Sequence, residues 1–294
     1  MLEFKKISLN DYEIIKAYSL AYPARQCDRS AGATLMWADY YDNYYAVCDG
    51  TITFTSNFTG GICFTYPVGR NVDGMLDKIR EYCIEQNIPM TVCGVNKDEI
   101  DFVKSKYPDC EISADRDWFD YLYEKEAIMS LAGRKYATQR NHINKFKKLY
   151  TDYVFEEITE NNIPEIIEFT KNFTFNAEKD ESAETELEIC ISVLENYKKY
   201  ALSGGALRID GRIVGYSIGE VIGDTLIVHI EKADVSYHGA YQMVTNSFLR
   251  MYADNDTVKY VNREEDCGDE GLRKSKLSYN PVELIEKYTV KIRN

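Results

Sequence analysis

Hydrophobic and polar residues recur along the chain with two periods, one typical of strands and one of helices. In the first half this pattern predicts helices at 10–20, 73–86 and 98–106 and strands at 44–48, 51–56, 62–66, 89–95 and 118–123. Asp49-Gly50 separates the first two strands, and this dipeptide favours a tight hairpin turn. The mixed order of helices and strands predicts an α+β (mixed α/β) fold.

The second half repeats this order. The pattern predicts helices at 164–173, 183–199, 240–253 and 270–277 and strands at 206–209, 213–220, 225–233, 258–263 and 286–292. Asp210-Gly211 forms a second hairpin signal, 161 residues after the first. We therefore infer a topological duplication, with an N-terminal domain at 1–127 and a C-terminal domain at 128–294 that begins with a connecting helix at about 128–150.

The charge is unevenly distributed. The 294 residues carry a net charge of −13, of which residues 151–294 contribute −11. A field of this sign repels polyanions and argues against a DNA-binding protein. Residues 127–151 contain no acid, but they contain His142 and the basic residues Arg134, Lys135, Arg140, Lys145, Lys147 and Lys148. This segment is either a solvated strut or a contact for tRNA or another polyphosphate.

Other classes of protein fit the sequence less well. The eight cysteines include no C-x-x-C pair, and the chain has only three histidines, so we expect no metal site. No apolar run approaches the ~20 residues of a membrane-spanning helix, and the first residues do not resemble a signal peptide. We expect a mature cytoplasmic protein with no stable membrane insertion. Its oligomeric state is left open.

His229 and Glu231 are the most notable pair in the second half. They are two positions apart in the strand predicted at 225–233, so strict alternation would place both side chains on one face. A histidine beside a carboxylate can move a proton. The alternative is a structural pair in which the carboxylate satisfies a core histidine.

The segments that follow this strand carry further candidates. Ser236–Gln242 form a Gly-containing turn that opens a helix, where free N–H groups suit a phosphate or carboxylate; a plain strand-to-helix turn is the alternative. Beyond it, the run 261–279 places polar side chains at a strand end and three cations, Arg273, Lys274 and Lys276, on the next helix. Neighbouring strand ends are where α/β sheets bind ligands.

The runs GRKYATQRNHINKF, HIEKA with HGAYQ, and YVNREEDCGDEGLRKSKLSYNP carry a resemblance over essentially the whole chain. They resemble the bacterial family grouped with the C-terminal catalytic domain of phosphatidylglycerol lysyltransferases, among the GNAT-like acyltransferases. The resemblance implies two tandem GNAT-like domains, each a mostly antiparallel sheet with flanking helices, as in Fem-type aminoacyltransferases.

The resemblance also implies roles for particular residues. GNAT folds place a backbone amide and often a carboxylate on the fourth strand, a pyrophosphate cradle in the turn after it, and a fifth strand that splays away. By position, Glu231 becomes the general base, assisted by His229. Tyr237, His238, Gly239, Ala240, Tyr241 and Gln242 become the donor-phosphate turn, and the splay is lined by Asn262, Arg263, Glu264 and Asp266. Lys274 occupies the position where many GNAT enzymes have a tyrosine acid, and Arg273 and Lys276 can support the oxyanion.

The sequence departs from the acetyl-CoA pattern Gln/Arg-x-x-Gly-x-Gly/Ala at Ser236 and Tyr241. We therefore expect an acyl- or aminoacyltransferase with no tightly bound cofactor, which uses aminoacyl-tRNA or an acyl thioester as donor. The acceptor would be the amine or hydroxyl of a small molecule, lipid or peptide. The alternative is a non-catalytic protein that binds an amino acid or a nucleotide. A lipid-modifying enzyme is a third interpretation, which the acidic charge opposes.

Overall fold

The computed structural model describes residues 2–57, 61–172 and 181–293 and divides into two compact units. The first unit comprises 1–120, 265–270 and 284–294, and the second comprises 121–264 and 271–283. The first holds β1 (Lys5–Lys6), α1 (Tyr12–Ala21), α2 (Ala31–Met36), β2 (Tyr44–Cys48), β3 (Thr51–Ser56), β4 (Cys63–Thr65), β5 (Val68–Gly69), α3 (Val72–Gln86), β6 (Met90–Val95), α4 (Ile100–Lys106), β7 (Glu111–Ala114) and β15 (Tyr288–Ile292).

The second unit is built around a sheet with longer central strands, β11 of 11 residues and β12 of nine. Its elements are β8 (Asp120–Glu124), α5 (Lys125–Ser130), α6 (Ala137–Leu149), β9 (Val154–Glu157), α7 (Ile163–Lys171), α8 (Glu181–Glu195), α9 (Tyr197–Tyr200), β10 (Ser203–Ile209), β11 (Arg212–Ile222), β12 (Thr225–Ala233), α10 (Ala240–Tyr252), β13 (Tyr260–Asn262), α11 (Glu270–Leu277) and β14 (Glu283–Ile285). Part of the helix predicted at 164–173 lies outside the described residues.

Apart from β5, which pairs with β3 in the first sheet alone, the two sheets have the same topology. The first has the strand order β1-β2-β3-β4-β6-β15-β7, and the second has the order β9-β10-β11-β12-β13-β8-β14. Each sheet has one parallel pair among its described strand pairs, and this pair has the same position in the strand order. It is β4 with β6 in the first sheet and β12 with β13 in the second. The predicted duplication and the predicted α+β class are therefore confirmed.

Both predicted hairpin turns are also present. Asp49 and Gly50 have φ of 50° and 70°, and Asp210 and Gly211 have φ of 47° and 77°. Two successive positive φ angles define the turn that matches the twist of a two-residue hairpin. The turns join β2 to β3 and β10 to β11.

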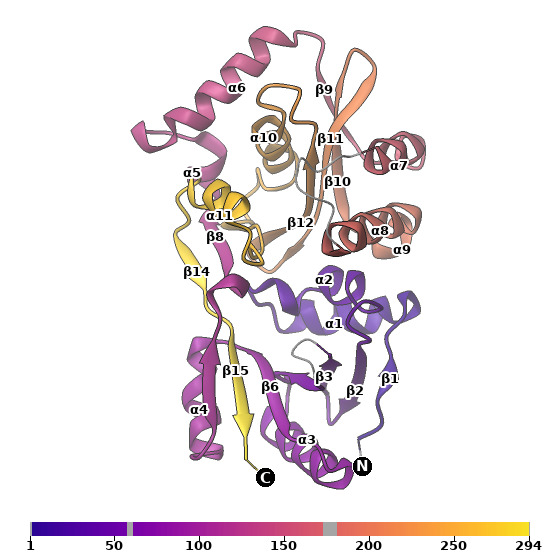
Figure 1. The fold of residues 1–294 in the computed structure, drawn as a ribbon, viewed down its shortest axis with the longest axis vertical. Coiled ribbons are helices and arrows are strands. Elements are labelled where there is room, and N and C mark those ends of the chain that lie inside the picture. Colours follow the sequence, from indigo (N-terminus) through magenta and orange to yellow (C-terminus); the bar gives the residue numbers. More distant parts are fainter. Residues whose placement is uncertain (1, 58–60, 173–180, 294) are drawn as a thin grey trace. The chain divides into compact units, whose positions relative to one another are not determined.

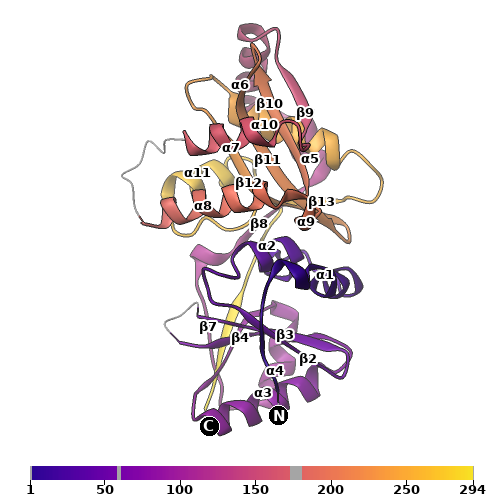
Figure 2. The ribbon, with the colours of Figure 1, turned by 90° about the vertical axis from the view of Figure 1, so that its right-hand side faces the viewer.

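The strand that completes each sheet comes from the other half of the sequence. β15, at the C-terminus, pairs with β6 and β7 of the first unit, whereas β8 pairs with β13 of the second. β15, drawn in yellow, lies among the strands of the first unit in Figure 1 and in Figure 2. The domain prediction placed 121–127 in the first domain and 284–294 in the second, and the structure differs at both places. Hydrophobic periodicity defines a strand but not the sheet that receives it.

Candidate functional site

The parallel pair β12 and β13 opens at one end. Thr225, Leu226 and Ile227 pair with Tyr260, Val261 and Asn262, after which β12 continues to Ala233 without a partner on that side. The fifth strand therefore splays from the fourth. The residues that flank this opening are His229 and Glu231 on β12 and Arg263 and Glu264 after β13.

The end of β13 is fixed by a local turn. The Asn262 side-chain oxygen accepts a hydrogen bond of 2.6 Å from the Glu264 backbone N–H, and Glu264 adopts a φ of 55°. Such a conformation is costly for a residue with a side chain, so the hydrogen bond must hold it. Asn262 is fully buried. It shapes the splay and does not present its amide to a ligand there.

A β-bulge at His229 breaks the alternation of β12. Ile227 is paired with Glu220 and Glu231 with Ser217, and the pairing passes from Val228 to Ile230 without a partner for His229. Ser217 and Glu220 are three positions apart on β11, so their side chains lie on opposite faces of the sheet. Their partners Glu231 and Ile227 therefore also lie on opposite faces. A Cβ at Gly219 would lie 2.2 Å from the Ile227 carbonyl oxygen, so the bulge requires glycine opposite it.

The prediction that His229 and Glu231 share a face is therefore wrong. Helices α7 and α8 cover the His229 face, where Thr170 bonds Tyr216 and Glu186 bonds Lys232. Helix α10 covers the other face. Figure 1 shows the helices on the two sides of the second sheet. The two side chains do not converge on one cleft, because one extra residue reverses the direction of every later side chain.

Glu231 and Arg263 form an ion pair on the α10 face. Arg263 Nη2 donates to Glu231 Oε1 at 2.7 Å, and Thr245 Oγ1 on α10 donates to the same oxygen at 2.9 Å. Their side chains are 11% and 10% exposed. The guanidinium lies 4.9 Å from the centre of the Tyr279 ring, and burial raises the pKa of Tyr279 to about 12. Glu231 is thus held in place by two partners, Thr245 on α10 and Arg263 after β13.

Three polar atoms of this face have no hydrogen-bond partner among the described residues. They are Glu231 Oε2, Arg263 Nη1 and Ser217 Oγ, and all three are buried. Ser217 is the direct cross-strand partner of Glu231, so the two side chains are neighbours. Leaving buried polar atoms unsatisfied costs about 1–3 kcal/mol each. An acceptor, a donor and a hydroxyl left open together indicate a place for a ligand.

His229 belongs to a separate network on the opposite face. Its ring nitrogens lie 2.7 Å from Glu264 Oε1 and 3.1 Å from Glu220 Oε1, and its side chain is 1% exposed. Burial alone would lower the pKa of His229, but hydrogen bonds to the two carboxylates and their negative charges raise it to about 10. At neutral pH the ring is an imidazolium, so His229 does not accept a proton for Glu231.

This pKa predicts a pH-dependent contribution to stability. The folded pKa of about 10 lies above the unfolded value of 6.5, so the stabilisation is complete below pH 6.5 and is lost as pH rises through 10. We expect His229→Gln to lower the free energy of unfolding by about 3–5 kcal/mol at pH 6, because the buried Glu220 and the partly buried Glu264 lose their cation. Urea unfolding of both proteins from pH 6 to 10.5 measures the difference, and a difference that does not shrink towards pH 10 would contradict the assignment.

The turn before α10 packs closely against α6. Gly239 has a φ of 80°, and a Cβ there would lie 2.6 Å from the carbonyl oxygen of His142. The Tyr150 hydroxyl lies 3.1 Å from the His238 backbone nitrogen, and the His142 and His238 rings are in contact at 3.3 Å between nitrogens. Packing thus accounts for the glycine of the predicted phosphate turn, and Gln242 at the end of that turn lines a polar cavity.

Replacement of this glycine tests the close packing. We expect Gly239→Ala to cost about 2–3 kcal/mol, since the new methyl group meets a backbone atom as well as an unfavourable φ. Gly211→Ala is the matched control, because Gly211 has a φ of 77° but nothing within 4 Å of its Cβ position. Both variants replace a glycine of positive φ, so the difference between their losses of stability in thermal unfolding measures the contribution of the steric contact alone. Equal losses would show that the contact with α6 is unimportant.

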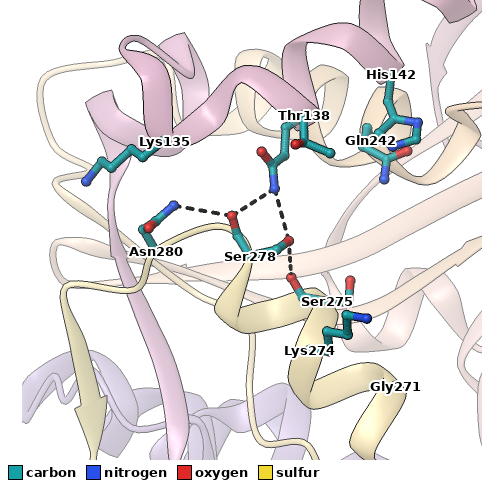
Figure 3. A pocket seen from close by; sticks show the side chains of 10 residues that line it. Lys135, Thr138, His142, Gln242, Gly271, Lys274, Ser275, Ser278 and Asn280 are labelled. Atoms are coloured by element: carbon teal, nitrogen blue, oxygen red, sulfur yellow. Dashed lines mark hydrogen bonds between the residues drawn. The ribbon is translucent and has the colours of Figure 1, made fainter.

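A polar cavity of about 610 Å³ lies between the start of α6, the start of α10 and α11. It is lined by Lys135, Thr138, Gln139, His142, Gln242, Gly271, Lys274, Ser275, Ser278 and Asn280. Figure 3 shows Lys135 and Lys274 reaching it from different elements. Of the residues predicted for the site, this cavity brings together Lys135, Gln242 and Lys274.

Two further residues predicted for the site, Lys276 and Asp266, have structural partners. Lys276 is buried and its Nζ donates to the Arg263 carbonyl oxygen at 2.6 Å, so it supports the end of β13. Asp266 is fully buried within the first unit, where Arg116 pairs with it at 3.2 Å, so it does not line the splay as predicted. Arg273 lies on α11 beside Lys274.

The basic segment is broken into pieces instead of one helix. Leu131 and Gly133 have positive φ angles and separate α5 from a 3-10 turn at Arg134–Tyr136 and from α6. Arg140 donates hydrogen bonds to the carbonyl oxygens of Leu131 and Gly133, so its charge closes this loop. Arg134 and Lys147, also predicted as polyphosphate contacts, are exposed.

A candidate metal-ligand cluster lies in the first unit. Cys27 Sγ and oxygens of Asp120 and Glu265 lie within 4.8 Å of one another. Lys287 Nζ stands among them, 2.6 Å from Asp120 Oδ1 and 3.3 Å from Cys27 Sγ. Burial and the surrounding carboxylates raise the pKa of the Cys27 thiol well above its usual value. A protonated thiol with an ammonium among the carboxylates is a poor metal site, because the protein supplies the cation itself.

Two repeated sheets, each with one parallel pair, and a splay between β12 and β13 define a tandem GNAT-like protein. Residues 21–291 match the family described as "Phosphatidylglycerol lysyltransferase, C-terminal", and the chain belongs to this family. The family is named for a transferase. Among the described residues, no helix is both long enough and apolar enough to cross a bilayer.

Two individual proteins are similar to this chain in sequence. An uncharacterised protein of Mycoplasmoides gallisepticum is 30% identical over 195 residues, which are 66% of this chain and 62% of that relative's length. A conserved protein of unknown function from Bacteroides thetaiotaomicron is 33% identical over the full length of both chains, with a TM-score of 0.92.

Two more distant structures share the fold alone. L-PGS from Bacillus licheniformis is 10% identical and covers 96% of this chain and 92% of its own, with a TM-score of 0.68. FemX is 9% identical to this chain, and the match covers 99% of this chain and 98% of FemX, with a TM-score of 0.63. The predicted relationship to the lysyltransferase C-terminal domain is thus confirmed.

Proposed function

We propose that this protein is an acyl- or aminoacyltransferase whose reaction centre is the Glu231–Arg263 pair. The observation that carries the proposal is the group of unpartnered buried atoms, Glu231 Oε2, Arg263 Nη1 and Ser217 Oγ, beside the opening of the sheet. A free carboxylate oxygen accepts a proton or an ammonium group. A free guanidinium N–H donates to a carbonyl oxygen. When an amine attacks an activated carbonyl carbon, the amine has a proton for the carboxylate, and the carbonyl oxygen accepts the hydrogen bond of the guanidinium.

The proposed reaction is a direct transfer. The nucleophilic amine or hydroxyl forms a bond to the carbonyl carbon of the donor, and its proton passes to Glu231. The tetrahedral oxyanion accepts a hydrogen bond from Arg263. The bond to the departing oxygen or sulfur then breaks, and Glu231 gives the proton that it accepted to the leaving group, which restores the carboxylate. Tyr279, with its pKa raised to about 12 by burial, remains protonated at neutral pH beside Arg263.

The main chain at the bulge fits the same centre. The His229 side chain is 1% exposed although the residue as a whole is not buried, so solvent reaches its backbone. A bulge in a central strand leaves a backbone group outside the regular ladder. By the family resemblance, the fourth strand supplies a backbone amide at the reaction centre, and we propose that it comes from this bulge.

Transfer of a labelled group tests the proposal. The purified protein is incubated with a ¹⁴C-labelled aminoacyl-tRNA or acyl-CoA together with phosphatidylglycerol vesicles, a peptide amine or a small amine, and products are separated by chromatography. We expect label to move from one donor to one acceptor. Binding of an amino acid or nucleotide without transfer from any donor would instead support the non-catalytic binding protein.

A further inference from the structure

We propose that Cys27 and Lys287 form a crosslinking site, at which a peroxide joins the cysteine sulfur to the lysine nitrogen. This inference is independent of the proposed transferase function. Both residues belong to the first unit, Cys27 between α1 and α2 and Lys287 directly before β15. Cys27 is 3% and Lys287 8% exposed, and Lys287 Nζ lies 3.3 Å from Cys27 Sγ. A nucleophilic sulfur and an amine 260 positions apart in the sequence are therefore in direct contact.

Asp120 holds the sulfur and the nitrogen together. Its carboxylate is fully buried at the start of β8. Its Oδ2 accepts a hydrogen bond of 2.8 Å from the Cys27 backbone N–H, and its Oδ1 lies 3.3 Å from Cys27 Sγ and 2.6 Å from Lys287 Nζ. Asp28 and Glu265 lie 2.9 Å and 3.4 Å from the same nitrogen. The ammonium is thus surrounded by carboxylates that can take up its proton when the nitrogen reacts.

The chemistry of the pair favours a condensation that needs one oxidant. A cysteine sulfenic acid condenses with a thiol to a disulfide, or with a nitrogen to a sulfenamide. Besides the Lys287 amine, the groups that contact Cys27 Sγ are the carboxylates of Asp28, Asp120 and Glu265. An amine is a stronger nucleophile than a carboxylate, so the sulfenamide is the expected product.

The reaction balances in two steps. In the first, the sulfur attacks one oxygen of hydrogen peroxide and the O–O bond breaks. The departing hydroxide leaves as water with the thiol proton, so the sulfur loses two electrons and the peroxide gains them. In the second, the Lys287 ammonium gives one proton to Asp120, the nitrogen attacks the sulfenic sulfur, and the S–O bond breaks. The hydroxide takes a second proton from the nitrogen and leaves as water. Burial raises the pKa of the Cys27 thiol, so little thiolate is present and the crosslink forms slowly.

The crosslink ties the loop between α1 and α2 to the closing strand of the first sheet. Lys287 immediately precedes β15, which pairs with β6 and β7. A covalent bond between 27 and 287 closes a long loop, which restricts the unfolded chain and so stabilises the fold. Two thiols of a reductant reverse it, since they return the thiol and the amine and become a disulfide. Oxidation thus fixes β15 in place, and reduction releases it.

Peptide mapping of the oxidised full chain tests the inference. The protein is kept with hydrogen peroxide, unfolded with an alkylating agent present, and digested with trypsin, and a second sample is first reduced with dithiothreitol. We expect fragments 26–29 and 277–291 to be joined, with two hydrogens lost from their summed mass, and to be separate after reduction. The crosslinked chain should also unfold at a higher guanidinium concentration than the reduced chain.

Three variants separate the crosslink from other oxidation. Cys27→Ser cannot form a sulfenic acid, and Lys287→Arg keeps the positive charge but not the amine, so both should lack the joined fragments. Cys83→Ser removes another buried thiol of the first unit and is the matched control, which should keep them. A disulfide between Cys63 and Cys93, whose sulfurs also lie 3.3 Å apart, would form equally in Cys27→Ser. The difference between that variant and the wild type therefore isolates the crosslink.

Three outcomes would overturn the inference. The first is a Cys27 that stays a thiol after long exposure to peroxide, and the second is its oxidation to the sulfinic acid while fragments 26–29 and 277–291 remain separate. Either would leave the cluster as an ion network without a covalent role. The third is an equal unfolding midpoint for the crosslinked and the reduced chain, which would show that the bond does not fix β15.

Discussion

Glu231→Gln should reduce the rate of transfer by about 10²- to 10⁴-fold while the protein stays folded. The rate falls because an amide oxygen does not take up the proton of the nucleophile, and loss of a general base typically has an effect of this size. The amide oxygen can still accept the hydrogen bonds of Arg263 and Thr245, so the position of the side chain is kept. The measurement is kcat for the donor and acceptor identified by transfer of label, with thermal unfolding as the test of folding.

Glu195→Gln is the control for loss of one negative charge, because Glu195 is an exposed residue at the end of α8. Its rate should equal that of the wild type. Glu231→Asp keeps the carboxylate but shortens the side chain, so we expect an intermediate rate. An unchanged rate in Glu231→Gln would remove Glu231 from the proton transfer and leave Arg263 as a binding residue.

Periodicity and turn residues were enough to predict most of the fold. The strand predicted at 225–233 and the helix predicted at 270–277 have those bounds in the structure. Both Asp-Gly turns lie where they were predicted, since positive φ angles favour these residue pairs. Short elements such as β7, β9 and α2 were missed because too few residues repeat the pattern.

The candidate site was predictable only in part. The sequence placed the acids of this site and Arg263 at neighbouring strand ends, and the structure resolves them into two pairs, Glu231 with Arg263 and His229 with Glu264. The assumption of regular alternation put His229 and Glu231 on one face, although Gly219 within a strand was a signal for a bulge. Thr245 and Ser217 were not predicted, because their relation to Glu231 depends on packing and register between elements far apart in the sequence.

The exchange of closing strands predicts that the last residues of the chain are essential to the first unit. Val290 and Ile292 of β15 are 0% and 5% exposed and belong to a core cluster with Met90 and Val92 of β6. Each loss of such a side chain costs about 2–5 kcal/mol, and the ladders with β6 and β7 are lost as well. A typical stability is ~5–15 kcal/mol, so removal of 287–294 should unfold this unit.

Calorimetry and tryptophan fluorescence measure this loss, since Trp37 lies in the first unit. The truncated chain should lose the transition of the first unit, whereas removal of 293–294 alone should leave it in place because β15 remains. A peptide with the sequence 284–293 should restore the transition in a concentration-dependent manner, as strand addition to an open sheet requires. A truncated chain that melts like the intact protein would show that β15 is dispensable. Val290→Ala, which keeps the strand but removes core volume, should fall between the two, with a cost of about 1–3 kcal/mol.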